Sequence, residues 1–149
     1  MNDYVNLFRE LKPGLLDFYG TNESYVTYNS HAPLSLKYRT HLHHLLLIEM
    51  VLKQHRDKHK KSISDLSGIK ALHHMAFLKT NWKPEEIRAT PINDLLFVLQ
   101  DEINTEGLPE EDRNYLKTIL NNDNPPKIDL ASYTGWQIAE GDQHLENQW

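Results

Sequence analysis

Histidine is the residue type whose number and spacing first suggest chemistry in this chain. Eight of its nine histidines lie between His31 and His74, and the sequence contains no cysteine. Histidine can act as a metal ligand, as an acid or base, or as a charge that changes near neutral pH. The absence of cysteine excludes disulfides, thiolate zinc sites and cysteine nucleophiles. The spacings that could assemble a site are two doublets and one i,i+4 pair: residues 43–44, residues 73–74, and His55 with His59.

Three polar residues fall within the apolar faces of predicted helices. At about 100° per residue, Glu49, His73 and Glu102 each lie on the core face of a different helix. A buried carboxylate needs a partner or a water-lined cavity. If the three helices pack as sequence neighbours, these residues could meet in a carboxylate–histidine site that binds a metal or transfers a proton. The simpler interpretation, which the sequence favours, is a buried hydrogen-bonded cluster with a structural role.

The remaining histidines of the first long helix form two separate pairs. His55 and His59 are one turn apart and could hold Zn²⁺ or Ni²⁺, but no third ligand is evident because Asp57 points to another side of the helix. We therefore expect them to be solvated at a basic helix end. His41 and His44 lie about 16 Å away along the axis. We expect this second pair to face a neighbouring element and to form hydrogen bonds there.

Known catalytic patterns are missing from the sequence. The Glu-x-x-His spacing of ferritin-like metal sites is absent, because Leu52 follows Glu49 and Thr105 follows Glu102 at that distance. There is no His-Glu-x-x-His, no glycine-rich phosphate loop and no Gly-x-Ser-x-Gly. We therefore predict no cofactor and regard an enzyme as the less favoured interpretation.

Hydrophobic periodicity and helix breakers indicate the elements that must position these residues. Residues 34–61 carry the strongest helical pattern, and their middle part, residues 42–52, is apolar on almost every side, as in a central buried helix. Prolines at first helical positions and glycines after last ones delimit the others. The other expected elements are helices over residues 3–11 and 15–19, separated by Pro13 and Gly14 and closed by Gly20, a strand over residues 25–28, and helices over residues 64–80, 84–90, 92–104 and 109–120.

These elements predict a mainly α fold. We expect a single domain over residues 1–149, built as a helical bundle or an orthogonal array of about five to six helices. Residues 1–30 would form an N-terminal helix and strand segment, residues 34–120 the helical core, and residues 121–149 an irregular extension. The extension could supply a strand that pairs with residues 25–28 in a minor two-stranded β-ribbon.

Composition indicates a soluble, cytoplasmic protein. The longest apolar run, residues 45–48, is too short to span a bilayer, and the N-terminus does not resemble a signal peptide. The net charge of −5 hides an asymmetry, because residues 31–90 carry a net charge of +6 and residues 91–149 one of −9. Such a split is typical of a dipolar surface that self-associates or meets a charged partner.

A basic segment suggests nucleic acid as one alternative partner. Residues 53–61 could contact phosphates through five cations: Lys53, Arg56, Lys58, Lys60 and Lys61. Sequence readout is disfavoured, because the short helix that would enter a groove begins with two glutamates and offers only Arg88 for base edges.

The function favoured by the sequence is that of a small, non-catalytic, cytoplasmic protein that acts through protein–protein interaction or regulation. Self-association fits the charge asymmetry and the central apolar helix. The alternatives are a nucleic-acid-associated regulator that uses residues 53–61 and a metal-dependent enzyme built on Glu49, His73 and Glu102. No membrane interaction is expected.

Overall fold

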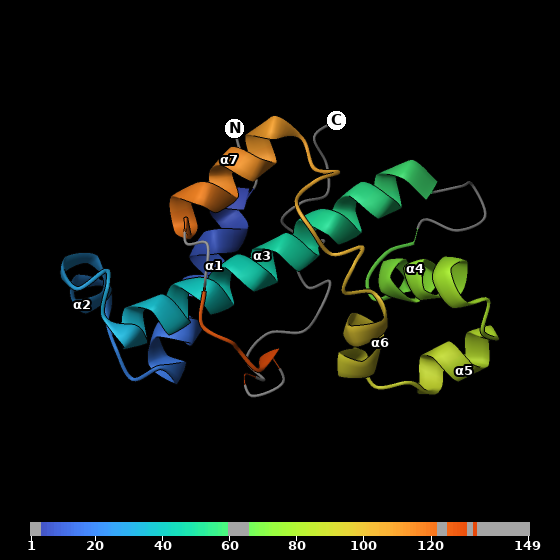
Figure 1. The fold of residues 1–149 in the computed structure, drawn as a ribbon, viewed down its shortest axis with the longest axis horizontal. Coiled ribbons are helices and arrows are strands. Elements are labelled where there is room, and N and C mark those ends of the chain that lie inside the picture. The colour runs from blue at the N-terminus through green and yellow to red at the C-terminus, as the bar shows by residue number, and fades with distance from the viewer. Residues whose placement is uncertain (1–3, 60–65, 122–124, 131–132, 134–149) are drawn as a thin grey trace.

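The computed structural model describes residues 4–59, 66–121, 125–130 and 133. Over these ranges the chain is mainly helical, as predicted, and contains no strand (Figure 1). No helix in the described ranges has the length and apolarity needed to cross a membrane. The helices are α1 (Tyr4–Phe18), α2 (Glu23–Tyr28), α3 (Pro33–His59), α4 (Lys70–Thr80), α5 (Pro84–Ala89), α6 (Ile92–Val98) and α7 (Glu110–Ile119).

Helix α3 is the centre of the fold. It packs against α1, α2, α4 and α7, while α4 also contacts α5 and α6. Figure 1 shows α1, α2 and α7 beside its N-terminal half and α4, α5 and α6 beside its C-terminal half. The all-round apolar pattern predicted a buried helix, and its apolar residues from Leu42 to Leu52 are buried apart from Leu47. At 1.5 Å per residue, 27 residues make a rod about 40 Å long that both groups of helices share.

The predicted break in the first helix is wrong, because α1 continues through Pro13. An internal proline removes one backbone hydrogen bond and costs about 3 kcal/mol or more. The face of α1 that carries Leu7, Leu11 and Leu15 is at most 3% exposed, and burial of three such side chains offsets that cost. Gly20 ends the helix as expected, at a φ of +64° that glycine adopts without strain.

The predicted strand over residues 25–28 is also wrong, because these residues form the end of α2. The side chain of Asn22 caps the helix by accepting a hydrogen bond of 2.9 Å from the Tyr25 amide. Val26 then packs among the core residues. A local cap and one buried contact therefore override the weak strand preference of valine, threonine and tyrosine. The β-ribbon is not seen in the described residues, and most of its expected second partner, residues 121–149, lies outside them.

The second and third long helices are shorter than predicted. Helix α4 begins at Lys70 rather than at residue 64, because Leu66 and Gly68 have left-handed φ values of 57° and 62° that no α-helix accommodates. Residues 60–65 lie outside the described ranges. Helix α6 ends at Val98, and turns carry the chain through the remaining residues that were expected to be helical. Helix α7 agrees with its prediction to within one residue at each end.

Candidate functional site

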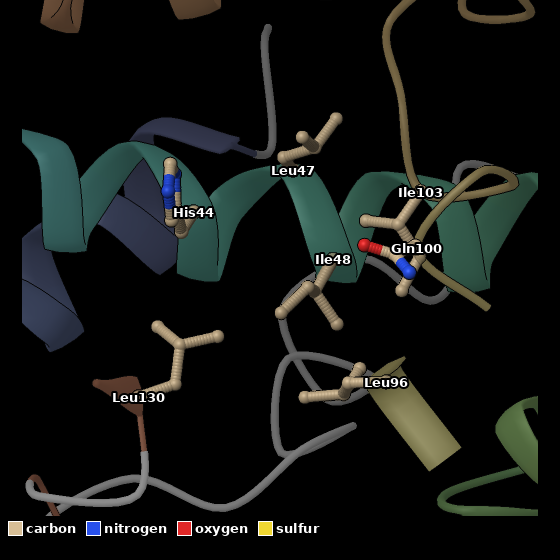
Figure 2. A pocket seen from close by; sticks show the side chains of 7 residues that line it. All are labelled: His44, Leu47, Ile48, Leu96, Gln100, Ile103 and Leu130. Carbon is tan, nitrogen blue, oxygen red and sulfur yellow. The ribbon is translucent and has the colours of Figure 1, made fainter. Parts of the chain in front are cut away.

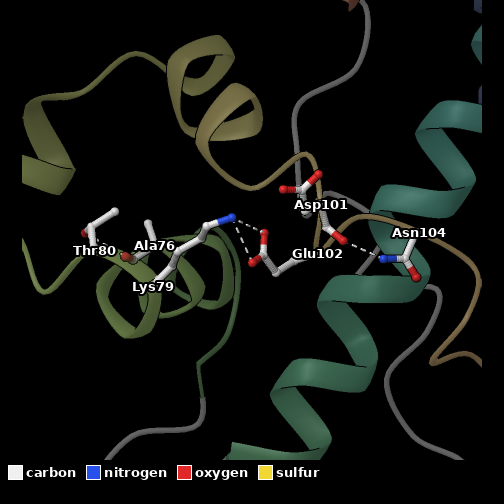
Figure 3. Close-up of polar contacts among 6 residues, drawn as sticks. All are labelled: Ala76, Lys79, Thr80, Asp101, Glu102 and Asn104. Atoms are coloured by element: carbon white, nitrogen blue, oxygen red, sulfur yellow. Dashed lines mark hydrogen bonds and ion pairs between the residues drawn. The ribbon is translucent and has the colours of Figure 1, made fainter.

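Two of the three polar residues that the sequence placed on core faces, Glu49 and Glu102, lie in different environments. Glu49 is 1% exposed on the buried middle of α3. Glu102 is exposed, and both of its carboxylate oxygens lie 2.9 Å from the Lys79 ammonium (Figure 3). His73 is half-buried on α4, where burial lowers its pKa and the charge of Arg88 lowers it further. Glu102 is therefore part of a surface ion pair between α4 and the turns after α6.

The basic segment offers nucleic acid fewer accessible charges than its sequence suggested. Lys53 forms an ion pair of 2.8 Å with Asp57, and Arg56 is only 6% exposed. Lys58 is exposed. Lys60 and Lys61 lie outside the described residues. In the described part of α3, the side chains of this segment are thus engaged largely within the protein.

A cluster of three histidines lies where the end of α3 meets α4. His55 and His59 come from α3, and His74 comes from α4. The centroids of their rings are 4.3 Å apart for His55 and His59, 5.0 Å for His55 and His74, and 5.2 Å for His59 and His74. Nε2 of His55 and Nδ1 of His74 share a hydrogen bond of 2.8 Å. We call these three residues the histidine cluster.

Burial controls the protonation of His55 in the histidine cluster. It lowers the pKa of His55 to about 4, and the neighbouring charges of His59, His74 and Lys58 act in the same direction. A neutral imidazole keeps a lone pair that can accept a hydrogen bond or bind a metal. As the side chains stand, no group of three or more metal-ligating residues in the described ranges could hold an ion. The expectation that His55 and His59 are solvated is wrong, because both are half-buried. The sequence does not indicate their contact with His74, whose position depends on the connection between the two helices.

His41 occupies a second, fully buried environment. Its ring is 0% exposed, and Nδ1 lies 2.9 Å from the Tyr19 hydroxyl. Phe18, Tyr19 and Tyr133 surround it edge-on, with centroids 5.6 to 6.2 Å away. Burial lowers its pKa to about 4, with a smaller contribution from His44 that outranks the opposing charge of Asp129. The prediction that His41 would hydrogen-bond to a neighbouring element is confirmed, and its role is to anchor α1 to α3.

One pocket, of about 230 Å³, opens beside His44 (Figure 2). It lies between α3 and α6, and Figure 2 shows Ile48, Leu96 and Leu130 around it. Burial lowers the pKa of His44, so this imidazole brings no positive charge to the pocket at neutral pH. The walls are otherwise apolar apart from Gln100. Such a pocket suits an apolar side chain better than a charged substrate.

A second pocket, of about 260 Å³, lies among α1, α2, α3 and α7. Its charged lining residues already have partners: Lys12 binds Glu23, and Arg39 donates hydrogen bonds of 2.9 Å to the carbonyl oxygens of Ser30 and Ile119. Burial, followed by the charge of Glu23, raises the pKa of Tyr38 to about 12, so its phenol stays neutral. These groups hold helices together.

Exposed apolar side chains concentrate on the second half of the helical array. Eight large apolar side chains are exposed in the described residues, and five of them belong to α4, α6 and the turn between α4 and α5. We call this part of the surface the α4–α6 region. Its five exposed side chains are Phe77, Leu78, Trp82, Ile92 and Phe97.

Comparison with known proteins gives no relative to guide the assignment: no protein-family model, no curated protein and no solved structure matches this chain. The function must therefore be inferred from the chain's own surfaces and clusters.

Proposed function

We propose that this protein acts through protein–protein contact, that the α4–α6 region makes the contact, and that its partner is a second copy of the chain. The observation that carries the proposal is the concentration of exposed apolar side chains there, with Phe97 71% exposed and Leu78 50% exposed. Clustered exposed apolar side chains are typical of interaction sites. The role remains the non-catalytic, cytoplasmic one expected from the sequence.

The side chains involved are of the kind that supply binding energy. Aromatic residues, tryptophan above all, are enriched among the residues that dominate protein interfaces. Full burial of a phenylalanine is worth about 1.5–3 kcal/mol, so covering the exposed part of Phe97 contributes up to about 2 kcal/mol. Trp82 and Phe77 are 40% and 39% exposed and would add smaller contributions.

Charge favours a second copy over a strongly charged partner. Residues 70–102, which contain the α4–α6 region, hold four Lys and Arg against five Asp and Glu, interspersed along the chain. Two nearly neutral surfaces can approach without the repulsion that two like-charged surfaces would experience. A symmetric dimer uses the same surface on both copies, so the interface would bury each of these side chains in both copies.

Sedimentation velocity on the untagged protein tests the proposal over a concentration range from about 1 μM to 500 μM. We expect the wild type to form dimers at the upper end. Because both copies lose the ring, Phe97→Ser should weaken dimerisation by roughly 100- to 1000-fold, the equivalent of up to about 2 kcal/mol for each copy. Circular dichroism should show an unchanged fold, because Phe97 is mostly exposed.

The matched control is Tyr28→Ser on α2, where the side chain is 86% exposed but lies outside the α4–α6 region. This variant should dimerise like the wild type. A protein that stays monomeric throughout the range would reject the second copy as the partner. An equal loss in both variants would reject the α4–α6 region as the contact surface.

A further inference from the structure

The pocket among α1, α2, α3 and α7 contains a buried hydroxyl that no other described side chain uses. We call this cavity the four-helix pocket; Tyr38 of α3 lines it and is 3% exposed. The Tyr38 hydroxyl oxygen is buried and forms no hydrogen bond within the described ranges of the chain. A buried polar group costs free energy unless it is hydrogen-bonded, and most such groups in folded proteins have a partner. This hydroxyl is therefore available to a molecule that enters the pocket.

Arg39 brings a positive charge to the same pocket. Its Nε and Nη1 donate hydrogen bonds of 2.9 Å to the carbonyl oxygens of Ile119 and Ser30, which are uncharged acceptors. These bonds fix the side chain and use two of the five N–H donors of the guanidinium. Among the residues that the structure describes, no carboxylate forms an ion pair with Arg39. The guanidinium therefore keeps both donors and charge for an anion.

Lys12 makes the lining of the four-helix pocket positive overall. It forms an ion pair with Glu23, whose side chain is 62% exposed, so water screens the pair. Lys12 and Arg39 supply two positive charges, and Glu23 supplies the single negative charge of the described lining. This balance favours an anionic ligand over a cationic one.

Apolar side chains from all four helices form much of the remaining wall. They are Phe8 of α1, Val26 of α2, Leu42 of α3 and Ile119 of α7. Ligand sites commonly combine such walls with a few polar groups that fix the orientation of the ligand. A cavity of about 260 Å³ is small for a ligand site and suits a molecule of roughly ten non-hydrogen atoms. The ligand that matches this lining has an apolar body and one carboxylate.

We propose that the four-helix pocket binds a small monocarboxylic acid with an aromatic or branched aliphatic body, whose carboxylate accepts hydrogen bonds from the Tyr38 hydroxyl and the Arg39 guanidinium. Hydrogen bonds to ionised groups are stronger than neutral ones, and a guanidinium matches a carboxylate in geometry. Burial, followed by the charge of Glu23, raises the pKa of Tyr38 to about 12, so the phenol keeps the proton that it donates. The site is independent of the proposed dimer, because the described lining residues all belong to α1, α2, α3 and α7.

Isothermal titration calorimetry of the untagged full chain at pH 7 and low ionic strength tests the site, with 3-phenylpropionate as the probe. We expect one equivalent to bind saturably. The alcohol 3-phenylpropanol has the same body without the charge and should bind roughly tenfold more weakly or worse. The cation 3-phenylpropylamine should not bind. N-acetylphenylalanine places the carboxylate on a peptide-like group and should bind more weakly than 3-phenylpropionate, because its amide would meet apolar walls.

Tyr38→Phe separates a role in binding from a role in folding. It should weaken binding of 3-phenylpropionate by roughly tenfold or more, because the carboxylate loses a hydrogen bond. Its melting temperature should not fall, since the hydroxyl has no partner within the described ranges. Lys12→Gln is a second variant and should also weaken binding. The matched control is Tyr28→Phe, which removes a phenol hydroxyl on α2 outside the pocket lining and should bind the probe as the wild type does.

Four results would overturn the proposal. The first is the absence of saturable binding by the wild type up to about 10 mM 3-phenylpropionate. The second is equal affinity for the acid and the alcohol, because the carboxylate would then play no part. The third is unchanged binding in Tyr38→Phe, or an equal loss in Tyr28→Phe, which would place the probe elsewhere on the protein. The fourth is tighter binding of N-acetylphenylalanine, which would replace the free acid by the C-terminus of a peptide.

Discussion

The contact between Tyr4 and Asp112 gives the sharpest test of how the first and last described helices are held together. The Tyr4 hydroxyl on α1 donates a hydrogen bond of 2.9 Å to the Asp112 carboxylate on α7. The two residues are 9% and 8% exposed. In Tyr4→Phe the ring remains, but a buried carboxylate loses its donor. Hydrogen bonds to charged groups are worth about 1.5–3 kcal/mol, and we expect the free energy of unfolding to fall by that amount at pH 7. The melting temperature should then fall by roughly 3–12 °C.

The effect should depend on pH in a defined direction. Burial raises the pKa of Asp112 above its ordinary value of 3.8, against the hydrogen bond from Tyr4, which lowers it; Glu111 raises it and Lys53 lowers it. The folded state therefore holds this proton more tightly than the unfolded state does. The carboxylate opposes folding above the folded-state pKa, and this opposition disappears as the pH falls through that value. Because Tyr4→Phe removes a group that stabilises the charged form of Asp112, the loss of stability that it causes should be largest at neutral pH and smaller near pH 4.

Urea unfolding followed by circular dichroism at pH 7 and pH 4 measures both effects. Tyr115→Phe is the matched control, because its hydroxyl contacts the Tyr4 carbonyl oxygen at 3.5 Å, at the limit of a hydrogen bond. It should change stability by less than about 0.5 kcal/mol. Asp112→Asn keeps an acceptor without the charge and should remove the pH dependence of the Tyr4 effect. A loss in Tyr4→Phe no larger than that in Tyr115→Phe, or an equal loss at both pH values, would refute the reasoning.

Three further predictions concern acid stability, a close approach and a helix anchor. Burial lowers the pKa of His43 to about 4. The contribution of its neutral form to the free energy of unfolding is therefore complete above pH 6.5 and is lost as the pH falls towards 4. In urea titrations at pH 7 and 4.5, His43→Gln should reduce the loss of stability in acid by about 1–2 kcal/mol. A methyl group on Gly14 would overlap the Tyr133 hydroxyl, so Gly14→Ala should destabilise the wild type. In a Tyr133→Phe background the same change should raise the free energy of unfolding by up to about 1 kcal/mol. Equal shifts of the melting temperature in both backgrounds would contradict this. Arg39→Met loses two hydrogen bonds to carbonyls and should cost about 2–3 kcal/mol in urea unfolding, whereas exposed Lys37→Met on the same helix should cost little.

Local signals were sufficient to predict several helices. Prolines 84 and 109 begin or precede short helices whose first turns are acidic, and α5 and α7 agree closely with expectation. Prediction failed where packing or backbone conformation overrides the local pattern. Pro13 is accommodated within α1 because the leucines on both sides of it are buried together. Leu66 is the clearest example of such a failure, because a leucine gives no sequence signal for the positive φ that this residue adopts.

The position predicted for Glu102 is wrong for a geometric reason. A helical-wheel position has meaning only while the chain remains helical, and Glu102 follows the end of α6 at Val98. Its side chain therefore points where the turn directs it, to Lys79. The contact of His74 with His55 depends on how the ten residues between α3 and α4 place the two helices relative to each other. Hydrophobic periodicity does not determine that placement.

The link between Tyr4 and Asp112 also has a consequence for the order in which the chain can acquire its structure during synthesis. The two residues are separated by 108 positions, so the partner that α1 finds on α7 is made late. Helices α4 to α6 lie between them, and α4 contacts α3, α5 and α6 over much shorter separations. As the chain leaves the ribosome, α4 can therefore dock on α3 first, with α5 and α6 packed against it. The side of α1 that meets α7 stays uncovered until residue 119 has emerged, so a chaperone could still bind there after the other helices have packed.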